Sequence, residues 1–281
     1  MTKETAVLAP TPWQGIRSAR PYFTRPRTDL QGTVTTETTS TGQKFVVYLP
    51  PDHGTPDRDH AVLYHLHGAG VRWPWVAKDI HWLAAEHEQA AQRGIIEPMI
   101  IVGAYDPSRF SMWSDSTDGS NNRATAVLSD LIPHVETSYH PRTDRASRYI
   151  QGFSMGGFGA ATLGLKHQDL FAAIIIWDGA LHDWRTLNQG RSKIAANQFN
   201  DDEHSFQQWS PWTMAEQADL ARTPILVVAG LMEDYAQRYT DHLTRLGTDV
   251  TLASVDCLHD LRCLAQTHGQ QAFEFLANTR A

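Results

Sequence analysis

Short apolar runs alternate with amphipathic helical patterns along most of the chain, and this alternation limits the possible folds more than any other feature. The apolar runs have the length and composition of buried strands. Strands that alternate with helices indicate a mostly parallel sheet covered by helices on both faces. The sequence therefore predicts an α/β fold. The strand candidates are residues 61–66, 99–102, 148–151, 172–177, 224–229 and 250–255.

The segments between these strand candidates carry the helical part of the pattern. Apolar side chains recur at helical spacing from Val76 onward, and Gly94 is placed to end that helix. A second helix is expected around residues 127–135, where Pro133 should kink it or loosen its last turn. The remaining helix candidates are residues 155–165 and 264–280.

The chain divides into an irregular arm, residues 1–30, and one expected α/β domain, residues 31–281. One large domain is favoured because α/β folds often exceed 200 residues. The domain is expected to open with a hairpin that pairs residues 32–40 with residues 45–49. Residues 180–222 interrupt the alternation with a polar, tryptophan-containing stretch, so we expect an excursion over the functional site.

Composition excludes several classes of function. Asp and Glu number 31 against 24 Lys and Arg, a formal net charge of −7, which offers no footprint for nucleic acid. No stretch approaches the roughly twenty apolar residues of a membrane span. The first thirty residues lack the apolar run of a signal peptide. We therefore expect a cytoplasmic protein with neither nucleic acid nor membrane as a partner. The sequence does not indicate an oligomeric state.

Cysteine and histidine patterns predict no metal and no cofactor. The two cysteines, Cys257 and Cys263, make neither a disulfide framework nor a four-ligand zinc site. Their spacing could close a small bridge, but we expect two buried or half-buried thiols. No pair among the 14 histidines has the H-E-x-x-H arrangement of a helical zinc site. His65 and His67 share one face of a strand candidate, where we expect no metal.

The segment GFSMG at residues 152–156 places a serine between a strand candidate and a helix candidate rich in small residues. This is the G-x-S-x-G nucleophile elbow. Its glycines leave room for a sharp turn that lifts the serine hydroxyl above the sheet, and the helix dipole favours negative charge at that point. We predict that Ser154 is a nucleophile.

A serine hydroxyl needs a base within hydrogen-bond reach, and the base needs a carboxylate behind it. On this type of sheet the chain order is serine, acid, histidine. His259 lies in the loop after the last strand candidate and is the predicted base. The acid is expected after residues 224–229, where Glu233 and Asp234 are adjacent. Periodicity does not choose between these two neighbours.

Backbone donors should stabilise the oxyanion of a tetrahedral intermediate. The amide of Met155, next to the nucleophile, is one predicted donor. The loop after residues 61–66 should supply the second, from Ala69 in preference to Gly68. Three further side chains stand just past strand ends and are expected to line the substrate pocket: Trp113, Trp177 and Asp178. For the two tryptophans, a buried structural role is the alternative.

With these motifs the chain resembles the putative-esterase superfamily of α/β-hydrolases, from about residue 43 to residue 278. That group includes esterase D, S-formylglutathione hydrolases, feruloyl esterases and enterochelin esterases. The elbow block at residues 152–160 carries the resemblance most specifically. The supporting segments are residues 66–68, 131–133, 210–212, 230–233 and 255–260. The resemblance implies Glu233 as the acid, although aspartate is commoner across the wider fold. The sequence departs from the family pattern just before His259, where Cys257 and Leu258 stand in place of the two glycines that family members often have.

The predicted function is therefore a serine esterase that cleaves a small carboxylic ester through an acyl-enzyme. One alternative is an acyltransferase, which would pass the acyl group to an alcohol or amine. Another is a non-catalytic binding protein on a hydrolase fold. The sequence does not name the ester.

Overall fold

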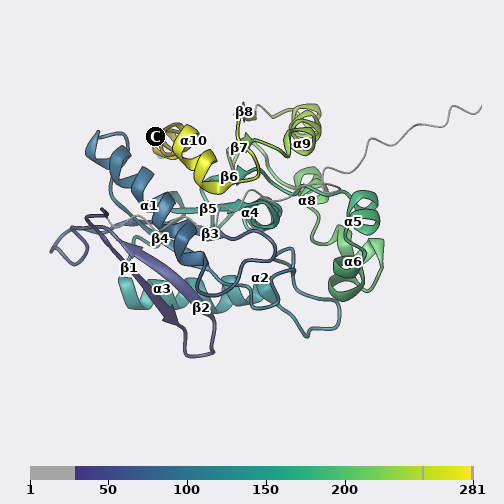
Figure 1. The fold of residues 1–281 in the computed structure, drawn as a ribbon, viewed down its shortest axis with the longest axis horizontal. Helices are drawn as coiled ribbons and strands as arrows, with labels where there is room; N and C mark the ends of the chain where they lie inside the picture. The colour runs from purple at the N-terminus through teal and green to yellow at the C-terminus, as the bar shows by residue number, and fades with distance from the viewer. Residues whose placement is uncertain (1–28, 249, 280–281) are drawn as a thin grey trace, which may run out of the picture.

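Eight strands in the described part of the chain form one mixed sheet through the middle of the molecule (Figure 1). The computed structural model describes residues 29–248 and 250–279, so the predicted arm at 1–30 lies almost wholly outside the described residues. The strand order is β1-β2-β4-β3-β5-β6-β7-β8; β2 runs antiparallel to both of its neighbours, β1 and β4, and all other neighbouring strands are parallel. The strands are β1 (Thr33–Thr38), β2 (Lys44–Leu49), β3 (Ala61–Leu66), β4 (Met99–Ala104), β5 (Arg148–Phe153), β6 (Ile174–Trp177), β7 (Ile225–Ala229) and β8 (Thr251–Ser254). The predicted α/β fold is confirmed.

Helices cover both faces of this sheet, because the central strands are apolar on both sides. Along β3, Tyr64 and Leu66 belong to the core under α3 and α4, whereas Ala61 and Leu63 belong to the core under α1 and α10. The helices of the two layers are α1 (Val76–Gln92), α2 (Arg123–Thr125), α3 (Ile132–Tyr139), α4 (Met155–Lys166), α9 (Glu233–Arg245) and α10 (Leu261–Asn278). Because the parallel strands run in one direction, they all end at the same edge of the sheet, where the loops that follow them can meet.

The helix around Pro133 differs from its prediction. Pro133 stands at the start of α3, and the helix continues beyond it to Tyr139. The distortion lies ahead of the proline, where residues Ala126–Leu131 form a π-helix. Proline has no backbone N–H to donate to the preceding turn, and a widened turn accommodates that loss. Of the two predicted effects of Pro133, a loosened last turn is wrong, whereas the helix is distorted next to the proline.

The segment between β6 and β7 departs from simple alternation, and it folds into four short helices at one side of the molecule (Figure 1). They are α5 (Trp184–Gly190), α6 (Ser192–Phe199), α7 (Glu203–Gln207) and α8 (Pro211–Gln217). Their apolar side chains, Phe206 among them, join the core that contains α4. This is the predicted excursion at 180–222, and its helical character was not foreseen. The assignment of one domain to residues 31–281 stays a prediction.

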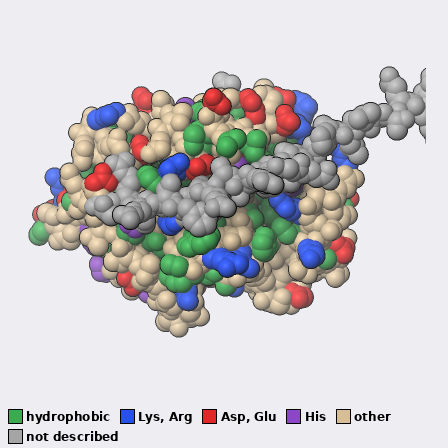
Figure 2. Space-filling model, in the orientation of Figure 1, with side chains coloured by type: hydrophobic (Ala, Val, Ile, Leu, Met, Phe, Trp, Pro, Cys, Tyr) green, Lys and Arg blue, Asp and Glu red, His purple; other side chains and the backbone are tan. Residues whose placement is uncertain are grey.

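The surface mixes both signs of charge. On the face drawn in Figure 2, Lys and Arg side chains are interspersed with Asp and Glu side chains. Within residues 29–248 and 250–279, no helix is long and apolar enough to cross a membrane. The same residues contain no group of three or more His, Cys, Asp or Glu side chains that could hold a metal ion.

Cys257 and Cys263 form a disulfide bond, so the expectation of two thiols is wrong. Cys257 lies in the loop after β8 and Cys263 in the first turn of α10, which brings their Cα atoms to 5.9 Å. That separation is within the range a disulfide spans. Disulfides persist mainly in oxidising compartments. The cytoplasmic location stays a prediction, and this bond does not favour it.

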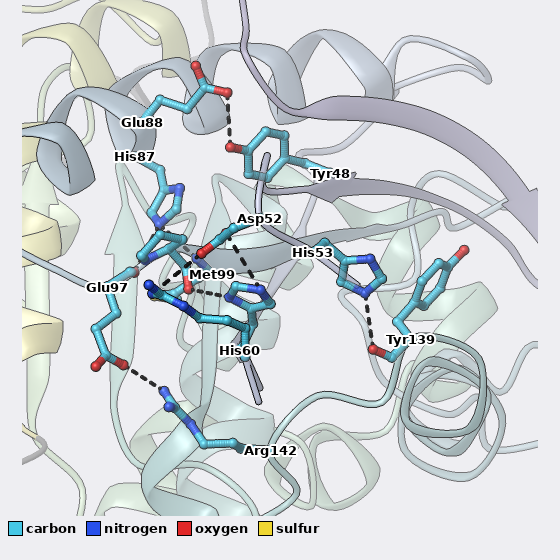
Figure 3. A network of polar contacts seen from close by, with 12 residues as sticks. Tyr48, Asp52, His53, His60, His87, Glu88, Glu97, Met99, Tyr139 and Arg142 are labelled. Carbon is cyan, nitrogen blue, oxygen red and sulfur yellow. Dashed lines mark hydrogen bonds and ion pairs between the residues drawn. The ribbon is translucent and has the colours of Figure 1, made fainter. Parts of the chain in front are cut away.

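The amino-terminal edge of the parallel strands carries a network of polar contacts (Figure 3). Tyr48 donates its hydroxyl to Glu88 of α1 at 3.0 Å. The backbone N–H of Met99, at the start of β4, donates to Nε2 of His87 at 3.1 Å. Nδ1 of His60 forms a hydrogen bond with the carbonyl oxygen of Pro98, and the two atoms are 3.0 Å apart. These contacts therefore attach helix α1 to β2 and β4, and join the segment before β3 to the segment before β4.

Candidate active site

Ser154 stands at the turn between β5 and α4. Its φ and ψ, 56° and −115°, lie outside the regions that residues other than glycine usually adopt. A Cβ on Gly152 would lie 2.0 Å from the carbonyl oxygen of Gly156, and a Cβ on Gly156 would lie 1.8 Å from the carbonyl oxygen of Leu66. Both glycines are therefore required for this turn, which places the serine at the carboxyl edge of the sheet.

His259 reaches the serine from the loop between β8 and α10. Its Nε2 lies 2.8 Å from Oγ of Ser154, although the two residues are 105 positions apart in the sequence. The imidazole also packs against the ring of Phe153, with centroids 4.6 Å apart. The structure thus brings together the two side chains that the sequence predicted as nucleophile and base.

The carboxylate that contacts His259 belongs to Asp178, which directly follows β6. Its Oδ2 lies 2.6 Å from Nδ1 of His259. Its Oδ1 accepts hydrogen bonds from the backbone N–H groups of Gly230 and Met232, each at 2.8 Å. The side chain is fully buried. A carboxylate accepts only, so Nδ1 carries the imidazole proton and Nε2 is left to accept from the Ser154 hydroxyl.

Glu233 and Asp234, the two predicted acids, do not occupy this position. Both are exposed in the first turn of α9, where negative charge is favoured by the helix dipole. The loop after β7 supplies backbone donors to Asp178 in place of a carboxylate. Strands β6 and β7 are neighbours that end at the same edge, so either loop can bring an acid to His259. Asp178 was predicted as a wall of the pocket, and the structure makes it the partner of His259.

The loop after β3 approaches Ser154 from the other side. A Cβ on Gly68 would lie 3.1 Å from a ring carbon of Phe153 and 3.2 Å from the Cβ of Ser154, so a side chain there would crowd the serine. Gly68 and Ala69 line the same cavity as Ser154. Met155 is the first residue of α4. The residues predicted to donate to an oxyanion therefore flank the serine on both sides.

His67 supports this loop from within the protein, a role that the sequence did not reveal. Its Nε2 accepts from the backbone N–H of Asp106 at 2.9 Å, so its proton is on Nδ1, which donates to the Gly68 carbonyl at 2.7 Å. Burial lowers the pKa of the His67 imidazole, which keeps the ring neutral. The backbone of the loop is consequently fixed next to Ser154.

Trp113 and Trp177 do not line the pocket, so that expectation is wrong. Both rings are buried, and neither contributes to the cavity at Ser154. Trp113 donates Nε1 to the His67 carbonyl at 3.0 Å and packs against Gly159 of α4. Trp177 donates Nε1 to the side chain of Gln151 at 2.7 Å. Trp177 is the last residue of β6, whereas Trp113 lies in the long loop after β4 and not just past its end.

A cavity of about 320 Å³ opens onto Ser154 and His259. Its wall combines aromatic rings with side chains of both charges. The lining side chains besides the serine and histidine are Lys78, Asp79, Trp82, Phe110, Phe153, Arg191, Asp260, Leu261 and Arg262. A second cavity of about 750 Å³ shares Phe110 and Arg191 with the first. Volumes of this size accommodate small organic ligands.

The parallel strands with crossover helices, and the serine turn at their carboxyl edge, are those of the α/β-hydrolases. The family assignment is narrower. The chain belongs to the Putative esterase family, whose model matches residues 36–254.

Two curated proteins illustrate the similarity in sequence. Esterase Rv1288 of Mycobacterium tuberculosis (strain ATCC 25618 / H37Rv) is 31% identical over 130 residues, which are 45% of this chain and 27% of that protein. The endo-1,4-beta-xylanase/feruloyl esterase of Xylanibacter ruminicola is 28% identical over 154 residues, which are 50% of this chain and 20% of that protein. The chain thus matches only about a quarter of the length of these relatives.

Solved structures show the same fold at low identity. A ferulic acid esterase superposes with a TM-score of 0.75 at 20% identity, over 90% of this chain and 100% of the other. The fluorophosphonate-binding serine hydrolase F of Staphylococcus aureus gives 0.71 at 18% identity, over 88% and 99%. An S-formylglutathione hydrolase from Agrobacterium tumefaciens gives 0.69 at 17% identity, over 91% and 98%. At these identities the likeness establishes the fold.

Proposed function

We propose that this protein hydrolyses carboxylic esters through an acyl-enzyme on Ser154. The observation that carries the proposal is the continuous chain of hydrogen bonds from Ser154 through His259 to Asp178, with its serine end in an open cavity. A hydroxyl beside an imidazole that is itself held by a buried carboxylate is the arrangement that activates serine nucleophiles. Membership of an esterase family agrees with it.

In the first half of the reaction, the imidazole acts as a base. Ser154 Oγ attacks the ester carbonyl while Nε2 of His259 takes the hydroxyl proton. The imidazolium that forms is stabilised by the Asp178 carboxylate, which stays ionised. The leaving alcohol then takes its proton from Nε2, and the acyl group remains on the serine.

The negative oxygen of the tetrahedral intermediate needs donors that are already in place. The backbone N–H of Met155 is proposed as the first, because it begins α4 and gains from the dipole of that helix. The N–H of Ala69, or that of Gly68, is proposed as the second. The His67 contacts support this assignment by holding the loop. Water then attacks the acyl-enzyme, with His259 again as base, and releases the acid.

The substrate is proposed to be a small ester, and the protein has space for the groups on both sides of the ester carbonyl. The cavities of about 320 Å³ and about 750 Å³ adjoin at Phe110 and Arg191. We assign one to the acyl part and the other to the alcohol part of the ester. A series of esters that varies one part at a time would identify which is which.

The test is a panel of chromogenic acetyl, butyryl and feruloyl esters, assayed with the parent protein and with Ser154→Ala. We expect at least one ester to be hydrolysed, and Ser154→Ala to reduce kcat by about 10⁴-fold or more. Ser129→Ala is the matched control, because Ser129 is exposed and lies outside the cavity at Ser154. Retention of most activity by Ser154→Ala would contradict the mechanism.

The same assay separates hydrolysis from acyl transfer. With an alcohol acceptor in excess, a hydrolase still releases the free acid, whereas an acyltransferase forms the acceptor ester. A protein that only binds ligands on this fold would turn over no ester in either condition.

A further inference from the structure

The loop that carries His259 is closed into a small ring by the Cys257–Cys263 disulfide. We propose that this bond is a positioning element of the active site, which holds the imidazole in register with Ser154 and Asp178. The inference rests on the proposed function, since it assigns a means of placing the base of that same reaction. Cys257 and Cys263 are the only cysteines of the chain, and both serve this bond.

The backbone of the His259 loop leaves β8 with a bond to the neighbouring strand, from the N–H of Val255 to the Ala229 carbonyl at 2.9 Å. Closer to the histidine, the N–H of Cys257 donates to the Val255 carbonyl, and the N–H of Asp260 to the Leu258 carbonyl. Leu258, next to the histidine, is 60% exposed. Catalysis depends on an exact placement of the imidazole, so a covalent constraint on both sides of His259 has a direct use in this loop.

The disulfide supplies this covalent constraint by joining the loop to α10. Cys263 lies in the first turn of that helix, whose N-cap Asp260 accepts from the N–H of Arg262 at 2.9 Å. The helix is fixed to the sheet by buried side chains such as Leu264 and Phe273. The bond therefore ties both sides of His259 to a rigid element.

Cys257, the other end of the disulfide, contacts the loop that donates hydrogen bonds to the Asp178 carboxylate. Cys257 packs on Gly230, where a Cβ would lie 2.5 Å from the Cys257 carbonyl oxygen and 3.4 Å from the Cys257 Cβ. Gly230 is one of the two backbone donors to Asp178. The same close contact thus relates the position of the histidine loop to the position of the acid. Breaking the bond should loosen the imidazole relative to both of its partners.

The first arm of the test leaves the sequence unchanged. Dithiothreitol transfers two electrons and two protons, so that the S–S bond breaks, two cysteine thiols form and the reagent closes to its cyclic disulfide. We expect reduction to lower kcat by about 10-fold, because a small misplacement of a catalytic group has effects of this size. We expect KM to change less than twofold, because the cavity wall remains. Reoxidation should restore the rate.

The second arm uses Cys257→Ser, Cys263→Ser and the double variant, none of which can form the bond. All three should show the same lowered kcat, and none should respond to dithiothreitol. Circular dichroism and the thermal midpoint verify that each variant is folded. A loss confined to Cys257→Ser would attribute the effect to packing on Gly230 and overturn the proposal.

The outcomes separate this inference from the proposed function. An active parent whose kcat is unaffected by reduction and by all three variants overturns the positioning role and leaves the esterase proposal intact. Two free thiols in the active, unreduced parent, titrated after denaturation, overturn it as well. A parent that hydrolyses no ester contradicts the proposed function first, and the positioning role with it.

Discussion

The two edges of the parallel sheet carry similar side chains and use them differently. At the amino-terminal edge, Glu88 accepts from the Tyr48 hydroxyl (Figure 3). It also accepts from the backbone N–H groups of Gln31 and Gly32. At the carboxyl edge, the His259 side chain bridges two other side chains, each from a different loop. Polar groups tied to backbone fix the chain. A titratable ring held between two side chains beside a cavity can move a proton.

Strand direction accounts for much of this difference. The carboxyl edge collects the loops that lead from the parallel strands into helices, including the start of α4 at Met155. Those loops lie outside the apolar core. They can therefore bring a serine, a histidine and an aspartate together. The amino-terminal edge receives the strand starts and the end of α1, where a polar group serves best by satisfying backbone donors. Three substitutions test whether function and stability separate in this way.

The largest effect is expected from Asp178→Asn. The amide preserves the shape but donates to Nδ1 of His259, so that Nε2 carries the proton and cannot accept one from Ser154. We expect kcat to fall by about 10³- to 10⁴-fold with the fold retained. Steady-state kinetics on the preferred ester measure it.

Glu233→Gln and Asp234→Asn are the matched controls for that variant. Each removes one carboxylate from the first turn of α9, at exposed positions. Both should retain kcat within about twofold, since exposed helix charges contribute little. A larger loss in either control than in Asp178→Asn would return the role of acid to the loop after β7.

Gly156→Ala should have the next largest effect, at the carboxyl edge alone. Its Cβ would lie 1.8 Å from the Leu66 carbonyl oxygen, so the turn at Ser154 must shift. We expect a loss of about 2 to 3 kcal/mol in unfolding free energy and a fall in kcat of about 100-fold. Gly190→Ala is the control, because a Cβ there meets no atom within 4 Å. Equal denaturation midpoints for the two variants would show that the elbow tolerates a side chain.

Tyr48→Phe tests the amino-terminal edge and should have the smallest effect on activity. Loss of the hydrogen bond to Glu88 should lower the unfolding free energy by about 1 to 2 kcal/mol, with kcat unchanged. Urea denaturation and ester kinetics on the same samples compare the two quantities. A fall in kcat at constant stability would break the separation of the two edges.

The Tyr48 hydroxyl should also make the free energy of unfolding depend on pH. Burial, and then the charge of Glu88, raise the pKa of the Tyr48 phenol above its usual 10.0. The unfolded chain therefore loses this proton first as pH rises, and stability declines above about pH 10. The phenylalanine variant lacks this decline, so the difference in stability between parent and variant should shrink at pH above 10.

Features set by local residue patterns could be predicted, and features set by neighbouring loops could not. The strand at 61–66 and the turn at Ser154 follow from apolar periodicity and from paired glycines, and the structure has both. The contact of Asp178 with His259 depends on which of two adjacent strand ends comes nearer, which periodicity does not encode. The inward turn of the Trp113 ring likewise depends on the space at Gly159. The disulfide depends on where α10 begins. The helix begins at Leu261, whereas the sequence pattern predicted a start at residue 264.

The most direct test of the account is the rate of labelling by a fluorophosphonate, with the adduct located by peptide mass spectrometry. The probe needs an activated serine but no knowledge of the natural ester. The account predicts a single adduct on Ser154 in the parent, and a labelling rate lower by about 100-fold or more in His259→Ala. An adduct on another residue, or equal rates in parent and variant, would contradict it.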